Sequence, residues 1–237
     1  MSPPPYLLAQ DEGRLREAAL RRRELLAGGL AAGVLSILPV TDALASGSAR
    51  REFRILRGGS DIGRHVLEAS LSEGRFEMSI DVDIRVTLLG ITAYRYTLAN
   101  REVWSGGQIV SIDSQTNDDG DKAHARIRRA GDGLEVDGSG YSGPAPGDAV
   151  TTSYYARPFI DRRPWLSTQS GRPLDISVAP APQERLDAWK VKGDLETRLI
   201  YDERAEWVGC VFDANGTEAR YEVIDEQGRI TALWKQA

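Results

Sequence analysis

Between Phe76 and Leu88, apolar and polar residues alternate without a break. The apolar positions are Phe76, Met78, Ile80, Val82, Ile84, Val86 and Leu88, and the positions between them are Glu77, Ser79, Asp81, Asp83, Arg85 and Thr87. Alternation with a period of two places all the apolar side chains on one face of a β-strand. A strand of this length with one solvent-exposed face needs a large apolar surface against which its other face can pack. No other feature of the sequence constrains the fold as strongly.

Stretches with the same period occupy most of the chain after Arg51. We expect further strands at Glu52–Arg57, Ile62–Leu71, Thr92–Trp104, Gln108–Thr116, Lys122–Ala130, Trp189–Tyr201, Glu206–Phe212, Glu218–Ile224 and Arg229–Trp234. Most are separated by short glycine-rich turns, and strands joined by tight turns are antiparallel neighbours. No amphipathic helix of comparable length is available to cover such a sheet. The sequence therefore predicts an all-β antiparallel meander that forms a lipocalin-like barrel or half-barrel.

One long Gly/Pro-rich excursion, Ser139–Arg185, interrupts the strand pattern. It predicts an irregular segment, with a short helix near Tyr154–Trp165, that caps the barrel or forms a lid over it. The chain has 237 residues, of which 41% are hydrophobic and 27% charged, enough for one sizeable core. We expect residues 46–237 to form a single β-barrel-like domain.

The N-terminal part has the order of an export signal. Arg22 and Arg23 precede an uncharged run, Leu25–Leu38, that is shorter than the roughly 20 residues of a membrane-spanning helix. Ala43 and Ala45 then provide a small-x-small cleavage signal. We predict that the signal occupies residues 1–45 and is cleaved near Ala45, which leaves no membrane span in the mature chain.

The stretch "RRELL", which begins at Arg22, also resembles a twin-arginine signal. This resemblance implies that the twin-arginine export machinery is a partner and that the mature chain is periplasmic. A single cysteine, Cys210, agrees with a fold that uses no intrachain disulfide.

Three longer stretches resemble a known family. They are "GGSDIGRH" from Gly58, "YRYTLANREVWSGGQIVSIDSQTNDDG" from Tyr94 and "LIYDERAEWVGCVFDANGTEARYEV" from Leu199. Together they are similar to an uncharacterised exported bacterial family known only as a domain of unknown function, which itself looks like other periplasmic β-meander proteins. The resemblance covers roughly Arg51–Ile224 and implies export and an all-β fold. It implies no reaction, ligand or catalytic residue.

Candidate catalytic groups are few. His65 shares a strand face with Leu67, Ala69 and Leu71, so we expect it to point inward, either as a core histidine or as a catalytic base. Glu102 and Asp113 are the carboxylates expected near the inner surface of the sheet, although surface ion pairs use the same residue types. Two histidines and one cysteine without ligand spacing give no metal site and no cofactor.

Aromatic residues are spread over several expected strands and the excursion, as in the lining of a cavity or in an ordinary β core. The candidates for ligand contact are Tyr94, Tyr96, Trp104, Tyr154, Tyr155 and Trp165. The net charge of −5 with interspersed signs provides no basic stripe, so nucleic acid is not an expected partner.

Three functions remain open. The leading hypothesis is a periplasmic protein that binds or carries a hydrophobic small molecule or lipid inside the barrel. A second is a cofactor-free lyase, isomerase or hydrolase that uses His65 with an inner carboxylate on a hydrophobic substrate. The third is an envelope structural protein with a filled core.

Overall fold

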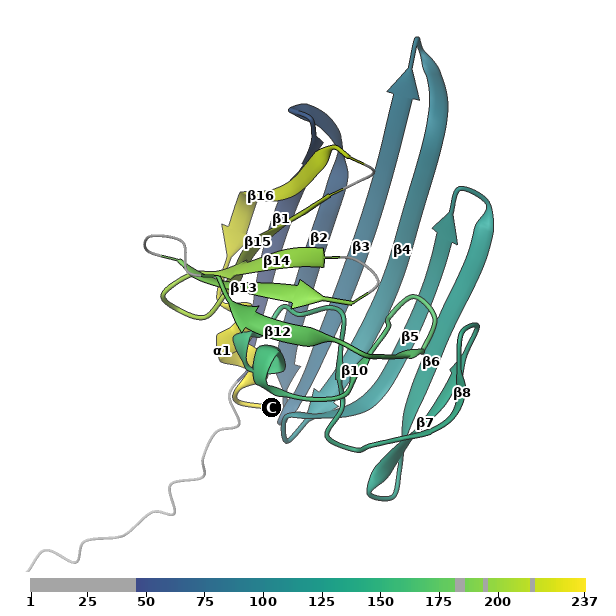
Figure 1. Ribbon diagram of the computed structural model, residues 1–237. Helices are drawn as coiled ribbons and strands as arrows, with labels where there is room; N and C mark the ends of the chain where they lie inside the picture. The colour runs from purple at the N-terminus through teal and green to yellow at the C-terminus, as the bar shows by residue number, and fades with distance from the viewer. Residues whose placement is uncertain (1–45, 182–185, 194–195, 214–215) are drawn as a thin grey trace, which may run out of the picture. The chain divides into compact units, whose positions relative to one another are not determined.

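The computed structural model describes residues 46–181, 186–193, 196–213 and 216–237. The predicted export signal, with Arg22, Arg23, Ala43 and Ala45, lies outside the described residues. The predicted all-β meander is confirmed (Figure 1). Eight strands follow one another as β1 (Gly47–Arg57), β2 (Ser60–Ser72), β3 (Arg75–Leu88), β4 (Ile91–Ser105), β5 (Gln108–Asp118), β6 (Asp121–Ala130), β7 (Gly133–Gly138) and β8 (Ser142–Ala145).

A second set of strands continues the same sheet on the other side of β1. It comprises β12 (Ser177–Pro180), β13 (Asp187–Lys192), β14 (Glu196–Tyr201), β15 (Trp207–Asp213) and β16 (Glu218–Gln227). Antiparallel pairing of β16 with β1 joins the two sets into one thirteen-stranded sheet with β12 and β8 at its edges. In Figure 1 the strands β12–β14 cross in front of the long strands β1–β4. The sheet is therefore curled and open, like a half-barrel.

The burial of β3 follows the predicted alternation. Phe76, Met78 and Ile80 are buried, whereas Asp81 and Asp83 are exposed. Toward the β3–β4 turn the inward positions Ile84 and Val86 become half-buried, because the hairpin extends beyond its neighbours (Figure 1). The core lies between the concave face of the sheet and the segments that cover it.

The excursion contributes the elements that cover this concave face. The short strands β9 (Val150–Thr151), β10 (Trp165–Leu166) and β11 (Pro173–Leu174) form a separate three-stranded sheet. A 3-10 helix at Arg157–Asp161 buries Phe159 and Ile160, in agreement with the short helix predicted near Tyr154–Trp165. We call Val150–Ile176 the covering segment.

Two sequence predictions about elements are wrong. Trp189–Tyr201 is a hairpin, β13 and β14, and its alternation looked continuous because Trp189 and Val191 face the same side as their partners Leu199 and Thr197. Arg229–Trp234 is not a strand, since α1 spans Ile230–Trp234. The buried Glu206 carboxylate accepts the Thr231 N–H at 3.0 and 3.1 Å, which satisfies the start of this helix.

Candidate ligand-binding cavity

A cavity of about 400 Å³ lies between the concave face of the sheet and the covering segment. Its volume is within the range of small-molecule pockets, roughly 300–1,000 Å³. Its apolar lining comes from both layers: Ile80, Val82, Tyr96, Leu98, Tyr154, Trp165, Leu174, Ile176, Val191, Leu199 and Tyr221. Residues of β3 and β4 thus face residues of β13 and β14 across the same space.

The strand alternation explains why the sheet presents these residues. Val82 pairs with Leu98 across β3 and β4, and Ile84 pairs with Tyr96, so their side chains share the inner face. The covering segment supplies smaller polar side chains opposite them, including Thr152, Ser153 and Thr168. Short side chains above a sheet of aliphatic residues leave the space unfilled.

His65 is buried at the wall of this cavity, as the sequence predicts for its strand face. It is 6% exposed, and its ring lies 5.2 Å from Trp207 and 5.4 Å from Tyr221, centroid to centroid. Neither ring nitrogen has a hydrogen-bond partner among the described residues. Burial lowers the pKa of His65 to about 3, because no described group compensates a charge there. The imidazole is therefore neutral, with one donor and one acceptor nitrogen.

Asn100, on β4, is the second buried polar group in the lining. Its amide nitrogen donates to Glu102 at 2.9 Å, whereas its carbonyl oxygen has no described partner. A buried acceptor without a donor is unfavourable by about 1–3 kcal/mol. The unpaired oxygen of Asn100 and the nitrogens of His65 are polar groups that a ligand can satisfy.

Glu102 is buried completely, two residues along β4 from Asn100, but it is fully paired. Its carboxylate accepts from Asn100, from the Trp104 indole at 2.9 Å and from the Thr151 hydroxyl at 3.1 Å. Desolvation raises the pKa of Glu102, and these hydrogen bonds oppose that rise. The residues around it form a filled end of the interior, where Trp104 contacts Phe159 at 5.2 Å and Trp234 at 6.1 Å between ring centroids.

The model of the family described as domain of unknown function DUF6134 matches residues 53–224. The chain belongs to this family. The predicted membership of an uncharacterised family is thus confirmed, whereas export stays a prediction.

Among solved structures, the chain is similar to a β-barrel-like protein of domain of unknown function DUF1849 from Brucella abortus. The TM-score is 0.56 at 10% sequence identity, over 78% of this chain and 99% of that chain. At this identity the likeness establishes the fold alone. No curated protein matches the chain.

The structure separates the predicted catalytic residues. Asp113 was expected at the inner surface, but it lies on the outer face, half exposed, and pairs with Arg128 at 2.7 Å. This expectation is wrong because neighbouring residues of β5 alternate, and Ile112 and Ser114 take the inward positions. Glu102 points inward but belongs to the filled end. No described carboxylate hydrogen-bonds to His65.

The predicted aromatic contacts divide into two groups. Tyr96, Tyr154 and Trp165 line the cavity. Tyr94 is not one of the lining residues, and its hydroxyl donates to Asp118 at 2.7 Å. Trp104 and Tyr155 are core residues of the filled end. Sequence reasoning missed Asn100 and the aliphatic lining, although the alternation of β3 does place Ile80 and Val82 on the inner face.

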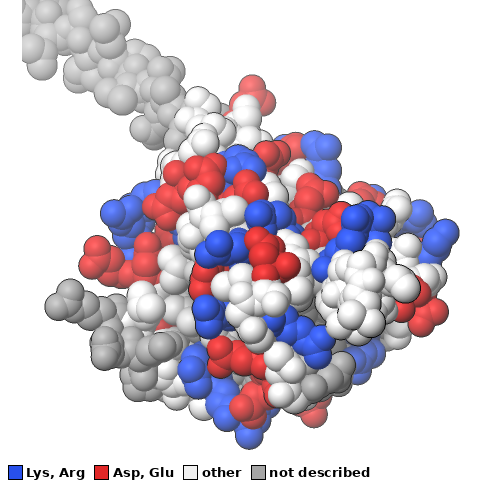
Figure 2. All heavy atoms as spheres, turned by 90° about the horizontal axis from the view of Figure 1, so that it is seen from above, with Lys and Arg blue, Asp and Glu red and all other residues white. Residues whose placement is uncertain are grey.

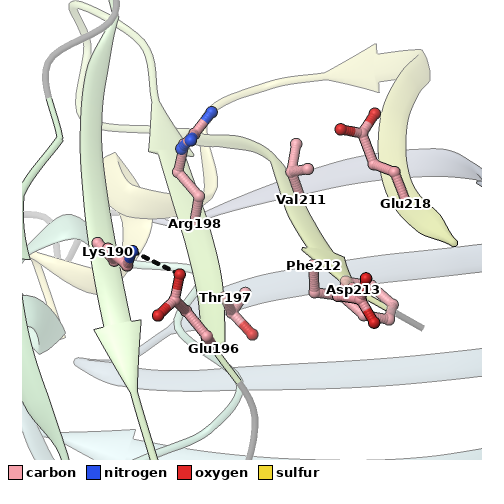
Figure 3. A pocket seen from close by; sticks show the side chains of 8 residues that line it. All are labelled: Lys190, Glu196, Thr197, Arg198, Val211, Phe212, Asp213 and Glu218. Carbon is pink, nitrogen blue, oxygen red and sulfur yellow. Dashed lines mark ion pairs between the residues drawn. The ribbon is translucent and has the colours of Figure 1, made fainter. Parts of the chain in front are cut away.

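A second hollow, of about 230 Å³, has a different character (Figure 3). Lys190, Arg198 and Glu218 are among its lining residues, and Lys190 forms an ion pair with Glu196 across the β13–β14 hairpin. Lys190 and Arg198 alternate with the buried Val191 and Leu199, so this hollow lies mainly on the outer face. Its lining is mostly charged and exposed, unlike that of the cavity between the sheet and the covering segment.

Proposed function

We propose that this protein binds or carries a hydrophobic small molecule or lipid in the cavity between the sheet and the covering segment. The observation that carries the proposal is the space of about 400 Å³, which aliphatic and aromatic side chains line together with short polar ones, and which has unpaired polar atoms of His65 and Asn100 in its wall. Aliphatic and aromatic side chains that form a concave site together with polar groups that can orient a ligand are typical of small-molecule sites.

The lining indicates the chemistry of the ligand. Among the described residues that line the cavity, Arg172 is the one with a charged side chain, and it is exposed. An apolar body therefore fits the interior, and a polar end fits the exposed side of the cavity. Within the cavity, neutral His65 and the Asn100 carbonyl favour an uncharged group that donates a hydrogen bond, such as a hydroxyl.

Titration with a dye that fluoresces in apolar surroundings tests the proposal. We expect one saturable site on the folded protein and displacement of the dye by a long-chain fatty acid. Folded protein that shows no saturable binding would contradict the proposal and favour an envelope structural protein with a filled core.

The alternative of a cofactor-free enzyme requires a base with an oriented partner. The low pKa of His65 and its lack of a described carboxylate partner favour a binding role over proton transfer. Turnover of a hydrophobic substrate that His65→Ala abolishes, with dye binding intact, would reverse this preference.

The compartment belongs to the same proposal. We propose that the protein is exported to the periplasm by the twin-arginine export machinery, supported by the order of arginine pair, short apolar run and small-x-small motif. Fusing residues 1–48 to a folded reporter tests it. Replacement of Arg22 and Arg23 by Lys should retain the reporter in the cytoplasm, and continued export would point to the general secretory route.

The structure adds one finding relevant to membranes. Among the described residues, none of the helices has the length and apolar character needed to cross a bilayer.

A further inference from the structure

The turn between β3 and β4 exposes an unusual concentration of aliphatic side chains. Leu88, Leu89 and Ile91 are 64%, 103% and 73% exposed. The hairpin that carries them projects beyond the strands on either side of it (Figure 1). Single exposed apolar residues are ordinary, but a cluster of this kind marks an interaction site.

The backbone makes this cluster more notable. Leu89 has a φ of +51° and is followed by Gly90 at +82°, a turn conformation that favours Asn, Asp or Gly. The neighbouring hairpins use polar residues or glycine at the equivalent position: Gly58, Glu73, Gly106, Asp119 and Gly131. Neither turn preference nor solubility explains a leucine at position 89. Contact of this side chain with a binding partner would explain it.

The tip carries no charged side chain, and the charged residues nearest to it are the two arginines that flank it. Residues 86–94 contain no charged side chain, and the flanking Arg85 and Arg95 face each other across the two strands. Arg95 pairs with Asp83 at 3.3 Å, whereas Arg85 has no ion pair among the described residues. Figure 2 looks down on this end of the domain, and the hairpin forms a white prominence among interspersed red and blue side chains.

We propose that the β3–β4 tip, residues 86–94, inserts into the surface of a phospholipid bilayer. The distance from Leu89 to Arg85 is four residues, about 13 Å along a strand. Apolar side chains that enter the headgroup boundary by roughly 5–10 Å place such arginines at the level of the lipid phosphates. Tyr94 lies one residue nearer the tip than Arg95 and pairs with Val86, and tyrosine is enriched at that depth.

The acidic β5–β6 turn determines which lipids suit the tip. Asp118 accepts from the Tyr94 hydroxyl, and Asp119 accepts from the Arg95 backbone N–H. These carboxylates offset the two arginines. Insertion is thus driven by the aliphatic tip, and zwitterionic phosphatidylcholine suffices.

A projecting tip also matches a bilayer better than a second protein. It is convex and three aliphatic residues wide, so a protein partner would need a complementary pocket, whereas a bilayer adapts to it. The inner face of β3 continues from Val82 in the cavity through Ile84 and Val86 to Leu88, an apolar track between cavity and tip. The proposal for the tip does not depend on a ligand in the cavity.

An environment-sensitive fluorophore at the tip tests insertion in the full chain. Ala93→Cys places the label on an exposed tip residue, and Cys210 is buried and does not compete for it. Glu73→Cys, in the turn between β2 and β3, provides the matched control, because this turn is at the other end of β3. With phosphatidylcholine vesicles we expect a blue shift for the label at position 93 and none at position 73.

Leu89→Asn separates insertion from folding. Asn suits the left-handed turn better than Leu, so the melting temperature should stay the same or rise. The apparent vesicle affinity of the tip should fall about tenfold or more, because one aliphatic group no longer leaves water. Absence of a shift at position 93, or a shift unaffected by Leu89→Asn, would overturn the proposal. Dimerisation that Leu89→Asn abolishes, without any vesicle effect, would assign the tip to a second copy instead.

Discussion

The interior of the curled sheet has two ends that are built from the same strands and differ in how they are filled. At one end, Trp104, Tyr155 and Phe159 pack together around the buried Glu102 carboxylate, which accepts three hydrogen bonds, although the Tyr155 hydroxyl has no described partner. At the other end, aliphatic side chains of β3 and β4 surround an open space, and the buried polar atoms of His65 and Asn100 have no described partner. Close packing stabilises the first end, and the second is available for a ligand.

The difference comes from both the sheet and the covering segment, since β4 places Trp104 at the filled end and Leu98 at the cavity. Over the filled end this segment places Tyr155 and Phe159, and over the hollow end it places the short side chains Thr152, Ser153 and Thr168 among the larger Tyr154 and Trp165. Asn100 lies at the boundary between the two ends. Its amide nitrogen donates to Glu102 of the filled end, whereas its carbonyl oxygen has no described partner. Aliphatic side chains of the sheet and short polar side chains of the covering segment together leave the space open at the hollow end.

Removal of the carboxylate at the filled end should have the largest effect. Glu102→Ala leaves the indole of Trp104 and the amide of Asn100 buried without their acceptor. We expect a loss of about 3 kcal/mol or more in the free energy of unfolding, measured by denaturant titration. Asp113→Ala is the control, because Asp113 is half exposed and its loss should change stability by about 0.5 kcal/mol or less. Equal losses would contradict the assignment of a filled, paired end.

Enlarging one residue at each end compares their packing directly. Met78→Trp adds volume to the filled end and should lower the free energy of unfolding by about 2–3 kcal/mol, because the surrounding side chains are closely packed. Leu98→Trp adds volume at the cavity wall and should cost less than about 1 kcal/mol while abolishing dye binding. Thermal melts and dye titrations measure both. If Leu98→Trp destabilises as strongly as Met78→Trp, the cavity is not a space that a side chain can occupy.

A smaller effect should appear in the pH dependence of stability. Burial lowers the pKa of His65 in the folded state to about 3, against about 6.5 in the unfolded chain. Below about pH 6.5 the unfolded chain binds a proton that the folded protein does not, so stability falls as the pH decreases. Between pH 7 and pH 5 the wild type should lose about 1–2 kcal/mol more than His65→Gln. Parallel stability curves for the two proteins would show that His65 is not buried in the neutral form.

Much of the fold follows from local sequence patterns, and the site does so only in part. The alternation of Phe76–Leu88 specifies the inner face of β3, and the same reasoning places His65 inside. Alternation shows on which face of the strand a residue lies, but it does not show where along the interior of the sheet that residue lies. It therefore does not distinguish Tyr96, at the cavity, from Trp104, in the filled end, although both lie on one strand.

The remaining features depend on contacts between distant segments. Asn100 is a boundary residue because of Glu102 and Thr151, and the latter belongs to the covering segment. Helix α1 replaces an expected strand where the Glu206 carboxylate meets the Thr231 N–H. Neither arrangement has a local signature, since each requires segments brought together by the complete fold.

Native mass spectrometry of the protein purified from its own cells shows whether the hollow end holds a ligand. We expect the wild type to retain one non-covalent apolar molecule and Leu98→Trp, purified in the same way, to carry none. A folded wild type that shows the same ligand-free mass as Leu98→Trp, apart from the substitution, would contradict it.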